Sequence, residues 1–138
     1  MTPLSFAWQL PQIALGAVVS AAPIISSKAV FEDKKICFWH SNMGMSLGHY
    51  IFLPEQLSEI PVDDLPAQAI FRHEFGHTIQ SSILGPAYLI AVGLPSVIWA
   101  HTPPLKKMRA SKNISYYDFT VEKDATRRGE GYFADITA

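Results

Sequence analysis

Residues 73–77 read His-Glu-Phe-Gly-His, inside a segment, residues 65–84, whose pattern predicts a helix. Two histidines four positions apart lie on one face of a helix, so both imidazole rings can reach one metal ion. Glu74 lies about 100° around the helix axis from His73, where its carboxylate can hold a water molecule beside that ion. The stretch therefore predicts a zinc site with His73 and His77 as two of its ligands.

The sequence also marks the two ends of this helix. Asp63 and Asp64 are good N-cap residues, and Pro66 suits a first turn. Gly85 and Pro86 stop the helix at its other end. The motif is therefore expected in the middle of a helix with a defined start and end.

A catalytic zinc ion takes three protein ligands, so the third must come from elsewhere in the chain. We favour Glu122, on a predicted helix over residues 115–128 that begins at a capping box, Ser115 with Asp118. Ala125, one turn further on, is small enough for this helix to approach the histidine helix closely. Glu122 and Ala125 form the Glu-x-x-Ala pattern of zinc peptidases with a glutamate ligand. The other candidates for the third ligand are His49, His101 and Asp118.

The remaining polar residues receive roles from the same chemistry. With zinc bound, Glu74 would act as general base, taking a proton from a zinc-bound water and passing it to the leaving amine of a peptide. Tyr116 or Tyr117 could donate to an oxyanion, although packing is the more frequent role of such residues. His49 could line a substrate groove. The competing interpretations are a chance match of the motif and a solvated Glu122 paired with a lysine.

Charge is distributed unevenly along the 138 residues. The chain has 11 Lys and Arg against 12 Asp and Glu, and this net charge of −1 argues against a nucleic-acid partner. Residues 1–27 and 83–100 contain no charged side chain. This lack of charge predicts membrane contact through residues 4–25 and 83–100, and the alternative for 83–100 is deep burial within the protein. The alternatives for 4–25 are a buried core helix, an interfacial helix and a true span, and its Gln and Pro residues disfavour the span.

The start of the chain also bears on location. It lacks the basic region that opens a standard secretory signal, so secretion by that route is not expected. Lys28, Lys34 and Lys35 follow the first uncharged segment and would favour a cytoplasmic location for the rest if that segment spans a membrane. We expect a cytoplasmic protein, or one associated with a membrane on its cytoplasmic side. The single cysteine, Cys37, excludes an internal disulfide and is interpreted as a packed core thiol.

The expected fold is α+β within one domain, residues 1–138. Residues 28–53 are expected to form a meander of short antiparallel strands, the last at residues 47–53. This small sheet would pack on the histidine helix, with two or three further helices around it, as in zincins.

Beyond the histidine helix, residues 87–100 predict a second, apolar helix. Gly93 and Pro95 should kink it, because proline removes a backbone donor and clashes with the preceding turn. A basic loop is expected over residues 105–114, and a loosely held tail from Glu130.

Several stretches together resemble a family of small, uncharacterised bacterial zinc metallopeptidases that is similar to the minimal glutamate zincins. They lie between about residues 6 and 129 and read Trp8-Gln-Leu-Pro-Gln, Ser46-Leu-Gly-His-Tyr-Ile-Phe-Leu, the run from Phe71 to Leu89, Gly93-Leu-Pro-Ser-Val-Ile-Trp-Ala and Tyr116-Tyr-Asp-Phe-Thr-Val-Glu-Lys-Asp-Ala. The resemblance implies a zincin-like fold, with His73, His77 and Glu122 as zinc ligands and Glu74 as the base.

The resemblance carries two further implications. The strand over residues 47–53 should form the upper rim of the cleft, where an extended peptide could add to an edge strand. In such families an acid usually follows the Glu-x-x-Ala segment, and this chain has Thr126 instead. An acid there would orient a metal ligand, so this site departs from the family pattern.

The leading expectation is a zinc metallopeptidase that binds one Zn²⁺ per chain and hydrolyses peptide or protein substrates. The alternative is a non-catalytic, membrane-associated interaction domain that binds zinc. Its motive is the pair of uncharged segments and the missing acid at Thr126.

Overall fold

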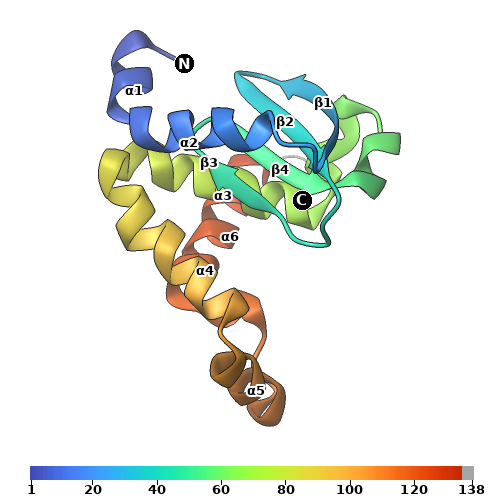
Figure 1. Ribbon diagram of the computed structural model, residues 1–138, viewed down its shortest axis with the longest axis vertical. Coiled ribbons are helices and arrows are strands. Elements are labelled where there is room, and N and C mark those ends of the chain that lie inside the picture. The colour runs from blue at the N-terminus through green and yellow to red at the C-terminus, as the bar shows by residue number, and fades with distance from the viewer. Residues whose placement is uncertain (135–138) are drawn as a thin grey trace.

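A small four-stranded sheet lies at the centre of the fold, which is α+β as expected (Figure 1). The computed structural model describes residues 1–134. The sheet is mixed, with the strand order β1-β2-β4-β3. The strands are β1 (Ile25–Phe31), β2 (Lys34–Trp39), β3 (Met45–Leu47) and β4 (Tyr50–Pro54).

The prediction of an antiparallel meander is wrong for one strand pair. β1 and β2 are antiparallel, as are β3 and β4, but β2 and β4 run parallel. The cause is a tight turn inside the predicted third strand, where Gly48 and His49 connect Leu47 to its partner Tyr50. Gly48 has a φ of +64°, which glycine adopts without steric cost. This turn makes β3 the edge strand and lets β4 lie beside β2.

Each face of the sheet is covered by a helix. Alternate side chains of each strand point to opposite faces, so both faces have side chains that can pack against a helix. On one face, Ile36 and Ile51 join a buried cluster with Phe71 and Phe75 of α3 (Ala69–Leu84). On the other face, the strand residues pack with Ile13 of α2 (Leu10–Ser20); they are Cys37, Leu47, Tyr50 and Phe52. Cys37 is buried, as predicted, and burial raises the pKa of its thiol.

The first uncharged segment forms two helices, α1 (Pro3–Trp8) and α2, and polar contacts fasten them to α3. The Gln12 amide donates to Ser81 Oγ (2.9 Å) and to the Gly85 carbonyl oxygen (2.8 Å), and Ser81 Oγ donates to Gln9 Oε1 (2.7 Å). The glutamines that disfavour a membrane span are therefore buried anchors within the protein.

A test of length and hydropathy over the described residues finds no single helix able to cross a membrane. One bent pair passes that test together: residues Ala69–Ala87 with Leu89–His101, bent by 119°.

The helix that carries the two histidines begins later than predicted. Asp63 and Asp64 lie in the first turn of a 3₁₀ helix, η2 (Val62–Ala67), which follows another, η1 (Glu55–Glu59). Gln68 is extended and separates η2 from α3. Gly85, with a φ of +57°, ends α3 as expected.

The second uncharged segment bends earlier than the sequence predicts, at the break between Ala87 and Leu89 and not at Gly93 and Pro95. It contains a 3₁₀ turn, η3 (Gly85–Ala87), then a π-helical turn, η4 (Leu89–Gly93), and then α4 (Leu94–His101). Residues 105–114 are not the predicted loop, because α5 (Pro103–Lys112) occupies most of them. The Pro103-Pro104 pair lies in its first turn, where proline's missing N–H leaves no bond unmade. In Figure 1, α4 and α5 extend away from the sheet.

The chain returns to the centre through η5 (Tyr116–Asp118) and α6 (Thr120–Tyr132). The capping box of Ser115 and Asp118 is present. The expectation of a loose tail from Glu130 is wrong up to Phe133, because α6 continues to Tyr132 and Phe133 is buried in the core. The rest of the predicted tail, residues 135–138, lies outside the described residues.

With α1, α2, α4, α5 and α6 around α3, the described chain has more helices than the two or three predicted in addition to the histidine helix.

Candidate metal centre

The centre is built on a close crossing of α3 and α6. A Cβ atom added to Gly76 would lie 1.8 Å from the Ala125 carbonyl oxygen, and one added to Gly129 would lie 1.7 Å from that of Arg72. Only glycine allows two backbones to meet at this distance. Ala125 is fully buried at the crossing, which is the close approach that its small side chain predicts.

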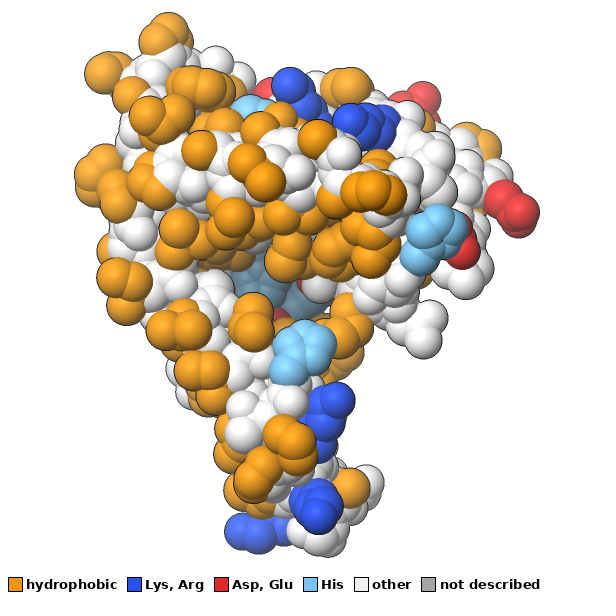
Figure 2. Space-filling model, in the orientation of Figure 1, with side chains coloured by type: hydrophobic (Ala, Val, Ile, Leu, Met, Phe, Trp, Pro, Cys, Tyr) orange, Lys and Arg blue, Asp and Glu red, His pale blue; other side chains and the backbone are white. Residues whose placement is uncertain are grey.

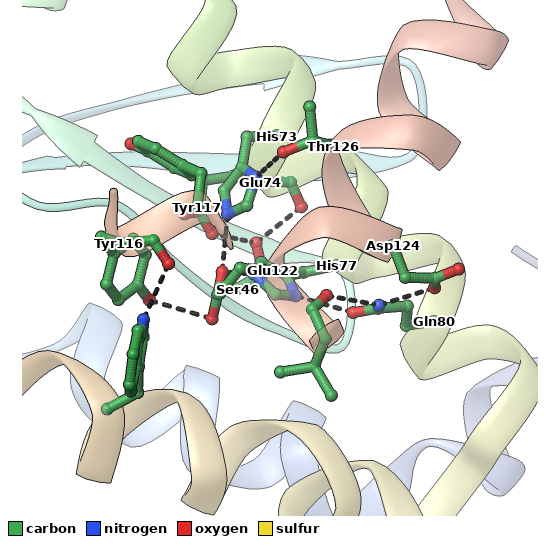
Figure 3. A network of polar contacts seen from close by, with 12 residues as sticks. Ser46, His73, Glu74, His77, Gln80, Tyr116, Tyr117, Glu122, Asp124 and Thr126 are labelled. Atoms are coloured by element: carbon green, nitrogen blue, oxygen red, sulfur yellow. Dashed lines mark hydrogen bonds and ion pairs between the residues drawn. The ribbon is translucent and has the colours of Figure 1, made fainter. Parts of the chain in front are cut away.

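This crossing brings Glu122 to the two histidines (Figure 3). Glu122 Oε2 lies 2.8 Å from His73 Nε2 and 3.0 Å from His77 Nε2. The two imidazoles are almost fully buried and the carboxylate is fully buried. Two ring nitrogens and one carboxylate oxygen thus converge on one point.

The outer nitrogens of both rings are also engaged, which fixes the ring orientations. His73 Nδ1 contacts Thr126 Oγ1 at 2.8 Å, and His77 Nδ1 donates to Gln80 Oε1 at 2.7 Å. The Gln80 amide in turn donates to Asp124 Oδ2 at 2.8 Å. A metal-binding histidine typically has such a partner on its second nitrogen. Thr126 thus contacts a ligand directly although it is no acid, and an acid, Asp124, reaches the other ligand through Gln80.

Glu74 points into the same site, and a residue of the sheet holds its carboxylate in place. The Ser46 hydroxyl of β3 lies 2.8 Å from both Glu74 Oε2 and the Glu74 carbonyl oxygen. The ligand atoms of His73, Glu74 and His77 lie within 4.8 Å of one another, so a metal could in principle use Glu74. Glu122 Oε2 lies within 3.0 Å of both Nε2 atoms, so the site offers two carboxylates, Glu74 and Glu122, as candidates for the third ligand.

The two tyrosines predicted near the site differ in their contacts. The Tyr116 hydroxyl donates to Glu122 Oε1 at 2.9 Å, whereas the Tyr117 ring packs edge-on against the His73 ring, 4.7 Å between centroids. Burial and the charge of Glu122 raise the pKa of Tyr116, which therefore keeps its proton. A third tyrosine, Tyr88, donates to the Ser46 carbonyl oxygen and was not singled out in the sequence.

The structure does not bring the other candidates to the metal centre. His49 lies at the β3–β4 turn, where its ring stacks on Tyr50 and Phe6. Asp118 accepts the backbone N–H of Ser115. His101 lines the cavity described below, but its ring takes no part in the Glu122 cluster.

Electrostatics in the metal-free protein follow from burial and pairing. Burial opposes ionisation of Glu122, but hydrogen bonds from His73 and His77 outweigh it and hold its pKa far below the usual range. Burial likewise disfavours a charged His77, but the bond to Glu122 and the charge of Glu74 raise its pKa.

A cavity of about 660 Å³ opens beside this centre. In Figure 2 it is the hollow between the body of the molecule and the arm of α4, with histidine and acidic surface at its floor. Glu74, His77 and Tyr116 reach it, so the site is accessible from the surface.

Compared with models of protein families, with curated proteins and with solved structures, the chain has no significant match. Arguments about function therefore rest on the residues and their geometry.

Part of this site was not visible in the sequence. Gln80 lies on the histidine stripe at i+3 from His77, which is a signal for a supporting residue. Asp124 and Ser46 gave none, because they reach the site only through the helix crossing and the β3 edge.

Proposed function

We propose that the protein is a zinc-dependent peptidase in which His73, His77 and Glu122 hold one zinc ion. The observation that carries the proposal is the convergence of both Nε2 atoms on one oxygen of Glu122, at 2.8 and 3.0 Å. Neighbouring ligand atoms around one small ion have separations of this order, and two nitrogens with one carboxylate suit zinc. The engaged Nδ1 atoms support the same ligand set.

A bound zinc ion would supply Lewis acidity, which activates water and polarises a carbonyl group. Glu74 is the residue that moves protons. Its carboxylate takes a proton from the attacking water as the new C–O bond forms, and it delivers a proton to the amine as the C–N bond breaks. Ser46 holds Glu74 in place for both steps.

Tyr116 is the best-placed donor for an oxyanion. It reaches the cavity, stays protonated and already donates to Glu122 at 2.9 Å. A modest rotation of this hydroxyl away from Glu122 would turn the same donor toward a substrate oxygen. Tyr117 packs on His73 instead, so its contribution is to hold the ring.

The substrate is proposed to bind as an extended chain along β3. In the described sheet β3 pairs only with β4, and its residues line the cavity next to Glu74. Unpaired N–H and C=O groups of an edge strand can accept another strand. In β3 the Ser46 carbonyl oxygen already accepts the Tyr88 hydroxyl, so a substrate would pair with the remaining groups or displace that contact. The prediction of an edge strand at residues 47–53 is wrong for most of that range, because β4 pairs with both β2 and β3, and the proposed rim is β3 instead.

Substitution of Glu74 tests the proposal. Glu74→Gln should lower peptide cleavage at least about 100-fold, because the amide cannot take up the proton. Zinc content measured on the same sample should match wild type. Equal cleavage by both proteins would contradict the role of Glu74, and an absence of cleavage by zinc-loaded wild type over a broad peptide library would contradict the peptidase function.

A non-catalytic, membrane-associated zinc domain is the second candidate. The observation that favours it is the exposure of apolar side chains on the outside of both uncharged segments, with Leu4 at 83%, Ile90 at 74% and Val18 at 71%. Such surfaces often mark lipid or protein contacts. Co-sedimentation with anionic vesicles that is lost in Val18→Asp and Ile90→Asp would favour it, and would agree with a membrane location on the cytoplasmic side.

A further inference from the structure

The cavity has polar groups at one end and apolar walls elsewhere. Glu74, His77 and the Tyr116 hydroxyl lie at the catalytic end. The walls consist mainly of aliphatic, aromatic and methionine side chains, among them Leu15, Val19, Trp39, Met45, Leu89 and Val97. Among the described residues that line the cavity, none is a lysine, arginine or aspartate. A ligand with one reactive polar group and a bulky apolar body fits this distribution.

Much of the apolar wall comes from the two uncharged segments of the chain, and residues 39–47 complete it. Residues 15–24 supply one side through α2 and the turn after it, and residues 88–101 supply the other through η4 and α4. The lack of charge in both segments thus has a local consequence, which is a water-poor wall facing the catalytic groups.

The size of the cavity limits the kinds of ligand that can fit it. A volume of about 660 Å³ is within the range of sites that enclose small molecules. It exceeds what any single side chain fills, so it has room for a large side chain together with the adjoining substrate backbone, whereas a charged side chain would find no partner in the apolar walls. A large apolar side chain gains the most binding free energy in this cavity, because burial of each CH₂ group is favourable.

We propose that this cavity is a specificity pocket that takes a large apolar side chain of the peptide substrate, such as Phe, Leu or Met, next to the cleaved bond. That this side chain belongs to a peptide that is cleaved rests on the proposed peptidase function. Binding of the side chain does not, because the apolar walls of the pocket are formed by residues other than the proposed metal ligands.

Binding is therefore measured first, on the catalytically blocked Glu74→Gln protein loaded with zinc. The probes are fluorescent short peptides of Ala, Gly and Ser in which one central position is Phe, Leu, Ala, Ser or Asp. The Phe and Leu peptides should bind roughly 10- to 100-fold more tightly than the Ala peptide, and the Asp peptide least tightly. A fatty-acylated form of the Ala peptide is included as a further probe. Equal affinity across the set would overturn the proposal, as would tight binding of the fatty-acylated peptide alone.

Two neighbouring residues of α4 provide a matched pair of variants. Val97 lines the cavity and Ile98 does not, yet both are about half exposed, at 51% and 47%. Val97→Lys should abolish most of the preference for Phe over Ala, because it places a cation in the apolar wall. Ile98→Lys should leave the preference unchanged. An equal effect of the two substitutions would contradict the pocket.

Cleavage by wild type separates this proposal from the previous one. Cleavage concentrated at one fixed position relative to Phe, Leu or Met supports both proposals. Cleavage with no side-chain preference contradicts the pocket and leaves the peptidase function standing. Selective binding of Phe peptides without any cleavage supports the pocket and contradicts the peptidase function.

Discussion

On the α3–α6 side of the cavity, the two helices are in backbone contact at Gly76 and Gly129, and the side chains of the centre are hydrogen-bonded. On the α2–α4 side, the walls are mainly apolar and range from buried to about half exposed. The first side leaves no room for a change in position of its ligands. The second side can accept a different side chain without moving them. We infer that metal geometry and substrate choice are separate properties of the two sides, so substitutions on each should have separable effects.

The largest effect is expected at the α3–α6 crossing, where the two backbones are in contact. Gly129→Ala would place a methyl group 1.7 Å from the Arg72 carbonyl oxygen, so α6 must move away from α3. We expect a loss of at least about 3 kcal/mol in the free energy of unfolding, because overpacking against backbone cannot be relieved by a rotamer change. Thermal or urea denaturation measures it.

Gly131→Ala is the matched control on the same helix. A Cβ atom there meets nothing within 4 Å. This variant should be more stable than wild type by roughly 0.5–1 kcal/mol, since alanine favours the helix. Similar changes in stability for the two variants would show that the crossing is not as close as described.

A smaller effect is expected where side chains orient the ligands. Gln80→Leu removes the acceptor for His77 Nδ1 and breaks the link to Asp124. Zinc affinity should fall about 10- to 100-fold, because the ring loses the partner that fixes its orientation. A competition titration with a chromogenic zinc chelator measures the dissociation constant.

The exposed Gln56 provides the control for this change. Gln56→Leu should leave zinc affinity as in wild type, and so should Val97→Lys on the other side of the cavity. A loss of zinc affinity in Val97→Lys comparable to that in Gln80→Leu would remove the distinction between the two sides.

The smallest effect concerns pH. Burial opposes ionisation of Asp124, but bonds from Gln80, Arg128 and Arg127 outweigh it and lower its pKa from 3.8 to about 2. Because the folded pKa is the lower one, ionised Asp124 stabilises the fold above pH 3.8, and this contribution is lost as the pH falls through about 2. Wild type should exceed Asp124→Asn by about 1 kcal/mol near neutral pH, an amount that allows for partial exposure.

Denaturation of both proteins over a pH series checks this. The difference should shrink to near zero by about pH 2. A difference that stays constant over this range would mean that Asp124 acts through packing and not through its charge.

The sequence predicted the α3–α6 side better than the sheet. Helical periodicity places His73 and His77 on one face of their helix, and it places Ala125 one turn after Glu122. Small residues allow the two helices to cross closely, and the structure brings these four residues together. The β3–β4 hairpin was missed, because Gly48 lies inside an apolar run that reads as one strand. Its positive φ became evident only with the fold.

Two other elements depended on tertiary contacts that no local pattern reports. α5 begins at a proline pair that reads as a helix stop, and it docks on α4, where Arg109 donates to the Trp99 carbonyl oxygen and covers the Trp99 ring. The uncharged segments were assigned to membrane contact by composition alone. Their inner residues line the cavity, which composition cannot distinguish from a lipid-facing surface.

The central claim is that His73, His77 and Glu122 hold one zinc ion beside Glu74. Metal analysis after purification and zinc reconstitution, on wild type, Glu74→Gln and His73→Ala, tests it most directly. We predict one zinc per chain in wild type, the same in Glu74→Gln, and little in His73→Ala with the fold retained by circular dichroism. Wild-type protein that retains only a small fraction of one equivalent, unchanged by His73→Ala, would contradict the account.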